Sequence, residues 1–145
     1  MIRQLTEFVL VAPQIGVDEV TEAAARGVTL ILKNRPEGES DDQTPGDAIE
    51  AAAKEAGIAY AAIPVTHAGF SGPQVAAMAD ALAGAHGKVL AYCRSGTRST
   101  LLWALAEASR GADPAVLGEQ AASAGYDLAP IQQMLAVLAG RAQGQ

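Results

Sequence analysis

Residues 93–98, Cys-Arg-Ser-Gly-Thr-Arg, combine the residue types that a thiol-based catalyst needs. Cys93 is the only cysteine of the chain and offers a nucleophilic sulfur, while Arg94 and Arg98 offer positive charge to an anionic substrate. A thiol next to arginine should ionise far more readily than a free thiol, because positive charge stabilises the thiolate. We therefore predict that Cys93 and Arg98 are catalytic and that the site acts on a small anion.

The segments on either side predict a sharp turn from strand to helix at this sequence. Residues 89–92 form a short apolar run typical of a buried strand, and residues 99–109 favour a helix. Backbone amides in such a turn point inward, and the positive end of the next helix faces the same place, so the turn suits an anion. We expect the thiol to stand open to small anions there. The predicted substrate-binding residues are Arg94, Ser95, Gly96, Thr97, Ser99 and His67.

Two other interpretations of these residues stay open at the level of sequence. A lone cysteine at the end of an apolar strand is more often a small buried hydrophobe than a catalyst. Here the strand exit, the cysteine, the small residues and the arginines coincide, which favours function. One of the two arginines, Arg94 or Arg98, is also open to a bracing role against the acidic segment at residues 37–42.

The alternation of apolar and polar segments predicts one α/β domain. Predicted strands lie at residues 7–12, 28–32, 58–63 and 89–92, and predicted helices at 19–26, 47–56, 73–85, 99–109, 114–124 and 128–139. Such alternation favours a mainly parallel sheet of four to five strands flanked by helices. Ligands collect beyond the carboxyl ends of such strands, where we expect Arg35, His67 and Cys93 to meet. We divide the single domain of residues 1–145 into a core of about 5–110 and a C-terminal helical extension of about 111–140.

The composition excludes several classes of function. The formal net charge of −6 argues against nucleic-acid binding, which needs a basic face. No apolar stretch approaches the length of a membrane span, and the first residues lack the pattern of a signal peptide. A single free cysteine fits a reducing compartment, so we predict a cytoplasmic protein. The two histidines and Cys93 do not have the spacing of a zinc site, and we expect neither a metal nor another cofactor.

This chain resembles two known families. The sequence Cys93-Arg94-Ser95-Gly96-Thr97-Arg98 resembles the C-R-x-G-x-R loop of rhodanese-type sulfurtransferases. Residues 12–15, 33–39, 63–65 and 91–104 resemble the bacterial β-lactamase-hydrolase-like, phosphatase-like family. The second resemblance implies a three-layer fold similar to dual-specificity phosphatases. Because members of that family occur alone or fused to a sulfur dioxygenase module, it also points to a sulfur dioxygenase as a partner.

The sequence departs from the protein tyrosine phosphatase pattern in two ways. Those enzymes use C-x5-R, whereas only four residues separate Cys93 from Arg98 here. Dual-specificity phosphatases also place an acidic residue in the loop that corresponds to residues 64–71, where this chain has no carboxylate. His67 is the one titratable side chain there that could act as an acid in its place. A shorter ring and a missing acid favour sulfur transfer, since sulfite and thiolates are good leaving groups.

The main functional prediction is therefore a sulfurtransferase. Cys93 would take a sulfur atom from thiosulfate or a persulfide and pass it to a thiol-type acceptor through a persulfide on Cys93. The first alternative is a phosphatase that acts on a phosphate ester through a phosphocysteine. The second is a non-catalytic module that binds an oxyanion or carries a persulfide. The sequence leaves the oligomeric state and the role of Arg35 open.

Overall fold

In the computed structural model, which describes residues 1–144, five strands form a single sheet in the order β1-β2-β5-β3-β4. The strands are β1 (Arg3–Gln4), β2 (Val9–Ala12), β3 (Val28–Lys33), β4 (Ala59–Ala62) and β5 (Lys88–Tyr92). Strands β2, β5, β3 and β4 run parallel, and β1 pairs antiparallel with β2 at one edge. This confirms the predicted single α/β domain with a mainly parallel sheet.

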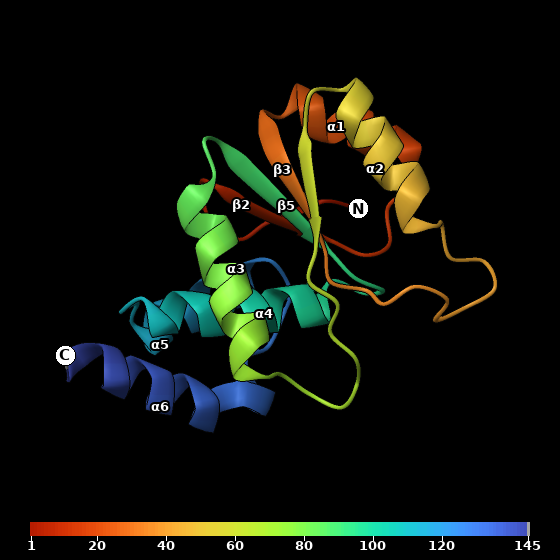
Figure 1. The fold of residues 1–145 in the computed structure, drawn as a ribbon. Helices are drawn as coiled ribbons and strands as arrows, with labels where there is room; N and C mark the ends of the chain where they lie inside the picture. The colour runs from red at the N-terminus through yellow and green to blue at the C-terminus, as the bar shows by residue number, and fades with distance from the viewer. Residues whose placement is uncertain (145) are drawn as a thin grey trace.

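The helices cover the two faces of the sheet unequally. They are α1 (Val17–Ala25), α2 (Gly46–Glu55), α3 (Gly72–Gly84), α4 (Thr97–Ser109), α5 (Pro114–Ser123) and α6 (Gln132–Gln143), with a short 3₁₀ helix η1 (Ala129–Ile131) before α6. Helices α1 and α2 lie on one face, while α3 and α4 lie on the other, with α5 and α6 beyond α4 (Figure 1). The three-layer arrangement is the one that the phosphatase-like resemblance implied.

Helix α4 is covered in part by the helices that follow residue 110. Ten of its 13 residues are buried, and from Leu101 onwards the buried side chains are all apolar. A helix with apolar residues on every side has to be covered on every side. The sheet covers one side of α4, and α3, α5 and α6 pack on the rest. The C-terminal helices, which carry no recognisable motif, are thus the cover of the helix that follows Cys93.

The amino-terminal strand is shorter than predicted, and it has a partner that we did not predict. The strand begins at Val9 rather than residue 7, because a turn precedes it: Thr6 Oγ1 accepts hydrogen bonds from the N–H groups of Phe8 (3.1 Å) and Val9 (3.0 Å). That turn folds β1 back onto β2. A strand of two exposed residues has no hydrophobic alternation, so it leaves no signal in the sequence.

Within residues 1–144, no helix combines the length and the apolar character needed to cross a bilayer. The cytoplasmic location stays a prediction, as does the division of the domain into residues 5–110 and 111–140.

Candidate active site

The loop around Cys93 has the predicted turn from strand to helix. Cys93 follows β5 directly, and Gly96 precedes the first turn of α4. The N–H of Gly96 donates a hydrogen bond to Cys93 Sγ at 3.1 Å. Gly96 has a φ of +92°, a conformation that glycine adopts without the strain a side chain would add. The sequence Ser95-Gly96 therefore lets the loop bend back and aim a backbone amide at the sulfur.

The thiol is not open to solvent as we expected. Cys93 is fully buried, with 0 % of the residue exposed, and Gly96 above it is buried as well. The ring of four residues between Cys93 and Arg98 is tight, so the Gly96 amide lies directly against the sulfur. In this arrangement the Cys93 thiol is therefore shielded from solvent.

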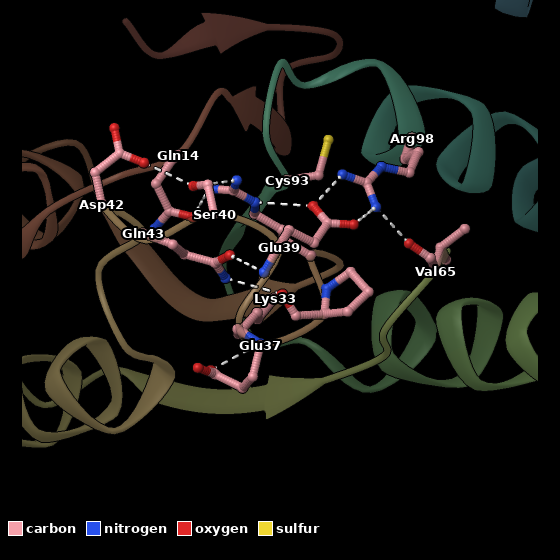
Figure 2. Close-up of polar contacts among 12 residues, drawn as sticks. Gln14, Lys33, Glu37, Glu39, Ser40, Asp42, Gln43, Val65, Cys93 and Arg98 are labelled. Carbon is pink, nitrogen blue, oxygen red and sulfur yellow. Dashed lines mark hydrogen bonds and ion pairs between the residues drawn. The ribbon is translucent and has the colours of Figure 1, made fainter. Parts of the chain in front are cut away.

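The two arginines of the loop have different surroundings. The Arg98 side chain is largely buried: Nη1 donates to Glu39 Oε2 at 2.7 Å and to the Val65 carbonyl at 2.6 Å, and Nη2 donates to Glu39 Oε1 at 2.7 Å (Figure 2). Arg94 is exposed, and its side chain makes no hydrogen bond within the described part of the chain. Arg98 is thus the arginine that braces the loop against the acidic segment, a choice that the sequence left open.

Glu39 is the carboxylate that pairs with the buried arginines on this side of the loop. Hydrogen bonds from Arg98 and from Arg35, with the positive charges of both, lower the pKa of the Glu39 carboxyl to about 2. Arg35 Nε donates to Glu39 Oε1 at 2.9 Å, and its two terminal nitrogens donate to Gln14 and Ser40. Glu39 in turn raises the pKa of Arg98, and the nearby Cys93 sulfur adds to that effect. One carboxylate therefore holds two buried guanidinium groups in fixed orientations.

This network shows the surroundings of Arg35, whose role the sequence left open. Arg35 forms an ion pair with Glu39, and it is only 3 % exposed. All three of its guanidinium nitrogens donate to protein groups. Arg35 consequently positions Glu39 instead of bordering a ligand pocket.

Asn34, which the sequence analysis did not single out, joins the strand ends to the loop. Its backbone N–H donates to Tyr92 O at the end of β5 (2.8 Å), and its side-chain amide donates to Ile63 O (3.0 Å). The side-chain carbonyl accepts from the hydroxyl of Ser99 at 2.8 Å. Ser99, predicted to bind substrate, is buried and already uses its hydroxyl to fix the start of α4. Its position favours a structural role.

The remaining predicted binding residues lie on the exposed side of the loop or away from it. Ser95 and Thr97 are exposed, and the Ser95 hydroxyl donates to Thr97 Oγ1 at 3.0 Å. His67 lies in an exposed turn between β4 and α3 and makes no hydrogen bond to the Cys93 loop within residues 1–144. The structure thus joins the strand ends at Asn34 and Cys93, but no hydrogen bond links His67 to them within residues 1–144.

Tyr126, in the segment between α5 and η1, contacts the loop from the C-terminal extension. Its hydroxyl donates to the Ser95 carbonyl at 3.1 Å. Burial raises the pKa of this phenol, Arg3 lowers it and the nearby Cys93 sulfur raises it. Sequence reasoning missed Tyr126 because it lies 31 residues from Ser95. The one signal was an aromatic residue with a polar tip directly after Gly125, in a break between two helices.

Comparisons with known proteins agree with the fold and with the loop. Residues 1–110 match the family model described as beta-lactamase hydrolase-like protein, phosphatase-like domain. A beta-lactamase hydrolase-like protein of Xylella fastidiosa is 37% identical over 107 residues, which are 74% of this chain and 25% of that protein. A homologue from Agrobacterium fabrum is 32% identical over 108 residues. The chain thus spans about a quarter of the length of the curated relatives it matches.

Solved structures give the same result. The crystal structure of a candidate phosphatase from Neisseria meningitidis is 28% identical, covers 94% of this chain and 96% of its own, and has a TM-score of 0.82. A second candidate phosphatase, from Shewanella putrefaciens, is 19% identical with a TM-score of 0.75 and supports the fold alone.

These findings favour the phosphatase alternative over the main functional prediction. None of them supports a sulfurtransferase, a rhodanese-like classification, a sulfur donor or a sulfur dioxygenase partner. The match over residues 1–110 covers most of the chain and includes Cys93 and Arg98. The chain therefore belongs to the beta-lactamase hydrolase-like, phosphatase-like domain family.

Proposed function

We propose that this domain hydrolyses phosphate monoesters through a phosphocysteine on Cys93. The observation that carries the proposal is the Gly96 N–H that donates to Cys93 Sγ at 3.1 Å, at the amino terminus of α4. An amide and a helix terminus that stabilise a thiolate also stabilise the oxygens of a phosphoryl group bound to it. Membership of a phosphatase-like family supports the same assignment.

The proposed reaction has two steps. In the first, the Cys93 thiolate attacks phosphorus, the S–P bond forms, the ester P–O bond breaks, and the leaving oxygen takes a proton from water. In the second, water attacks the phosphocysteine, the S–P bond breaks, and inorganic phosphate and the thiolate are released. The Gly96 N–H and the amino terminus of α4 stabilise the negative oxygens in both steps.

Arg98 is the proposed clamp for the phosphoryl oxygens. Its planar guanidinium suits oxyanions. The guanidinium also interacts electrostatically with the Cys93 sulfur. The hydrogen bonds from Arg98 to both oxygens of Glu39 fix the plane of the guanidinium before a substrate arrives. Such prior orientation removes part of the cost of organising the transition state. Arg94, exposed at the edge of the loop, attracts the anion from solvent.

The lack of a carboxylate at residues 64–71 sets the proposed substrate class. A general acid that protonates the leaving oxygen contributes roughly 10²–10⁴ in rate, and esters of weakly acidic alcohols depend on it most. His67 lies in an exposed turn and makes no hydrogen bond to the loop within residues 1–144. We therefore propose phosphate esters of good leaving groups, such as aryl phosphates, as preferred substrates over alkyl phosphates.

The test is a side-by-side assay of aryl-phosphate hydrolysis and thiosulfate:cyanide sulfur transfer, with wild type against Cys93→Ser. The proposal expects aryl-phosphate turnover that is lost in Cys93→Ser, and no sulfur transfer above background. A variant at an exposed residue of α1 whose ion pair is with Arg26, Glu22→Gln, should keep wild-type turnover. Cys93-dependent sulfur transfer without phosphate release would contradict the proposal, and so would phosphate binding without any turnover.

A further inference from the structure

One peptide unit of the loop is hydrogen-bonded at both ends. The Ser95 carbonyl accepts from the Tyr126 hydroxyl at 3.1 Å, and the Gly96 N–H donates to Cys93 Sγ, also at 3.1 Å. These two groups belong to the same planar amide, whose atoms turn together. Any contact that fixes the direction of the carbonyl therefore fixes the direction of the N–H that faces the sulfur.

Tyr126 is itself held in place from two directions. Its backbone N–H donates to Ala121 O at 2.9 Å, which ties it to the end of α5. Arg3 of β1 lies over the Tyr126 ring, 5.9 Å from its centroid, and donates to Ala124 O at 2.8 Å. The phenol also packs against Gly96 so closely that a Cβ at that position would collide with the Tyr126 hydroxyl. The tyrosine is thus a fixed support on the outer side of the loop.

We propose that Tyr126 is a positioning residue for the nucleophile: its hydroxyl holds the Ser95–Gly96 peptide so that the Gly96 N–H stays aimed at the Cys93 thiolate. A hydrogen bond to the carbonyl also polarises the amide and strengthens the bond that its N–H donates. Tyr126 lies outside residues 1–110, the part of the chain that the family model matches. The C-terminal extension, besides covering α4, therefore takes part in the site.

The charged groups around the Ser95–Gly96 peptide are separable from the Tyr126 hydroxyl. Arg94 is exposed on the same loop, directly after Cys93. Arg98 of α4 interacts electrostatically with the Cys93 sulfur, and Arg98 is paired with Glu39 of the β3–α2 loop. Arg3 faces the Tyr126 ring from β1. Replacing Tyr126 by phenylalanine removes none of these charges and keeps the aromatic ring. A change in thiolate reactivity in that variant therefore reports on the hydroxyl alone.

The inference rests on the proposed role of Cys93 as a thiolate nucleophile, but not on its substrate, so its test uses alkylation. Because Cys93 is the only cysteine, the rate of iodoacetamide labelling reports on this residue alone. Rates are measured across the pH range for wild type, Tyr126→Phe and the matched control Tyr60→Phe, which removes a half-buried phenol hydroxyl on β4. Thermal unfolding of all three proteins checks that each is folded.

In Tyr126→Phe, we expect the pH midpoint of labelling to rise and the rate below the midpoint to fall by about two- to tenfold, the effect of one hydrogen bond. The curves of wild type and Tyr126→Phe should converge at alkaline pH, where the thiol is ionised in both. Tyr60→Phe should follow the wild-type curve. With an aryl phosphate, the acid limb of the pH profile of kcat/KM should shift in the same direction.

Three results would overturn the inference. The first is a Tyr126→Phe labelling curve that superimposes on that of wild type. The second is a loss of labelling rate that is equal at every pH, because such a loss reports access to the thiol rather than its ionisation. The third is a folded wild-type protein whose Cys93 is not labelled at any pH. The expected labelling curves in a protein that hydrolyses no phosphate ester would instead contradict the proposed function alone. Tyr126 would then still position the thiolate.

Discussion

The loop around Cys93 is held from two sides, and the two sides use different chemistry. On the side of the β3–α2 segment, Glu39 binds the buried guanidinium groups of Arg98 and Arg35. On the side of the C-terminal extension, one neutral phenol, Tyr126, bonds to a backbone carbonyl. The charged side fixes an arginine side chain, and the neutral side fixes a peptide plane. Loss of a partner should lower the free energy of unfolding more on the charged side, because a buried charge is then left unpaired.

The largest effect should come from changing the geometry of the braced arginine while keeping its charge. In Arg98→Lys, a single ammonium cannot bind both oxygens of Glu39 and still reach Val65 O, so the proposed phosphoryl clamp is misplaced. We expect kcat for an aryl phosphate to fall by about 10²–10³.

The matched variant is Arg94→Lys, at the exposed arginine. Exposed charges contribute little individually, so we expect a change in KM of about two- to threefold with kcat nearly unchanged. Equal losses of kcat in Arg94→Lys and Arg98→Lys would show that the two arginines do not differ as their burial implies.

The next effect concerns the free energy of unfolding. In Glu39→Gln, Arg98 and Arg35 keep a hydrogen-bond partner but lose its charge, and we expect a loss of roughly 1.5–3 kcal/mol in urea unfolding. Glu22→Gln breaks an exposed pair with Arg26 and should change stability by less than about 0.5 kcal/mol. Similar losses in both variants would argue against a special role of the buried network.

The same carboxylate predicts a pH dependence of stability. The pKa of Glu39 is lowered from 4.5 to about 2 in the folded protein. Its contribution is therefore fully present above pH 4.5 and is lost as the pH falls from 4.5 towards 2. The thermal midpoint of wild type should exceed that of Glu39→Gln above this window, and the difference should shrink within it. A difference that stays constant down to pH 2 would contradict the assignment of the stabilisation to this ionised group.

The smallest effect tests whether the two sides are independent. Glu39 and Tyr126 share no hydrogen-bond partner. Their effects on stability in Glu39→Gln/Tyr126→Phe should thus add to within about 0.5 kcal/mol of the sum of the single variants. A larger coupling, measured by urea unfolding of all four proteins, would mean that the charged and neutral sides act as one unit.

Much of the fold and the centre of the site could be predicted from local sequence. The apolar runs of β3 and β5 and the glycines after α1 and α2 mark element ends within a few residues. The strand-to-helix loop was predictable because Cys93, Gly96 and Arg98 lie close together in sequence. The phosphatase-like fold followed from the resemblance, while the ranking of sulfur transfer above phosphate hydrolysis is not supported by the comparisons.

The contacts that the sequence did not reveal connect distant residues. Arg98 and Glu39 are 59 residues apart, and Tyr126 is 31 residues from Ser95. Neither spacing has a periodic signal, since both depend on how the β3–α2 segment and the C-terminal helices pack around α4. Burial of Cys93 was also missed, because the depth of a thiol depends on the closure of its loop rather than on its neighbours in sequence.

The most direct test of the proposed phosphatase function is to trap the covalent intermediate on Cys93. Wild type is mixed with an aryl phosphate, quenched rapidly in denaturant at alkaline pH and digested, and the peptide that carries Cys93 is analysed by mass spectrometry. We expect a phosphoryl group on Cys93 in wild type and none at position 93 in Cys93→Ser. Turnover that leaves Cys93 unmodified at every quench time, or a phosphoryl group on another residue, would contradict the proposed function.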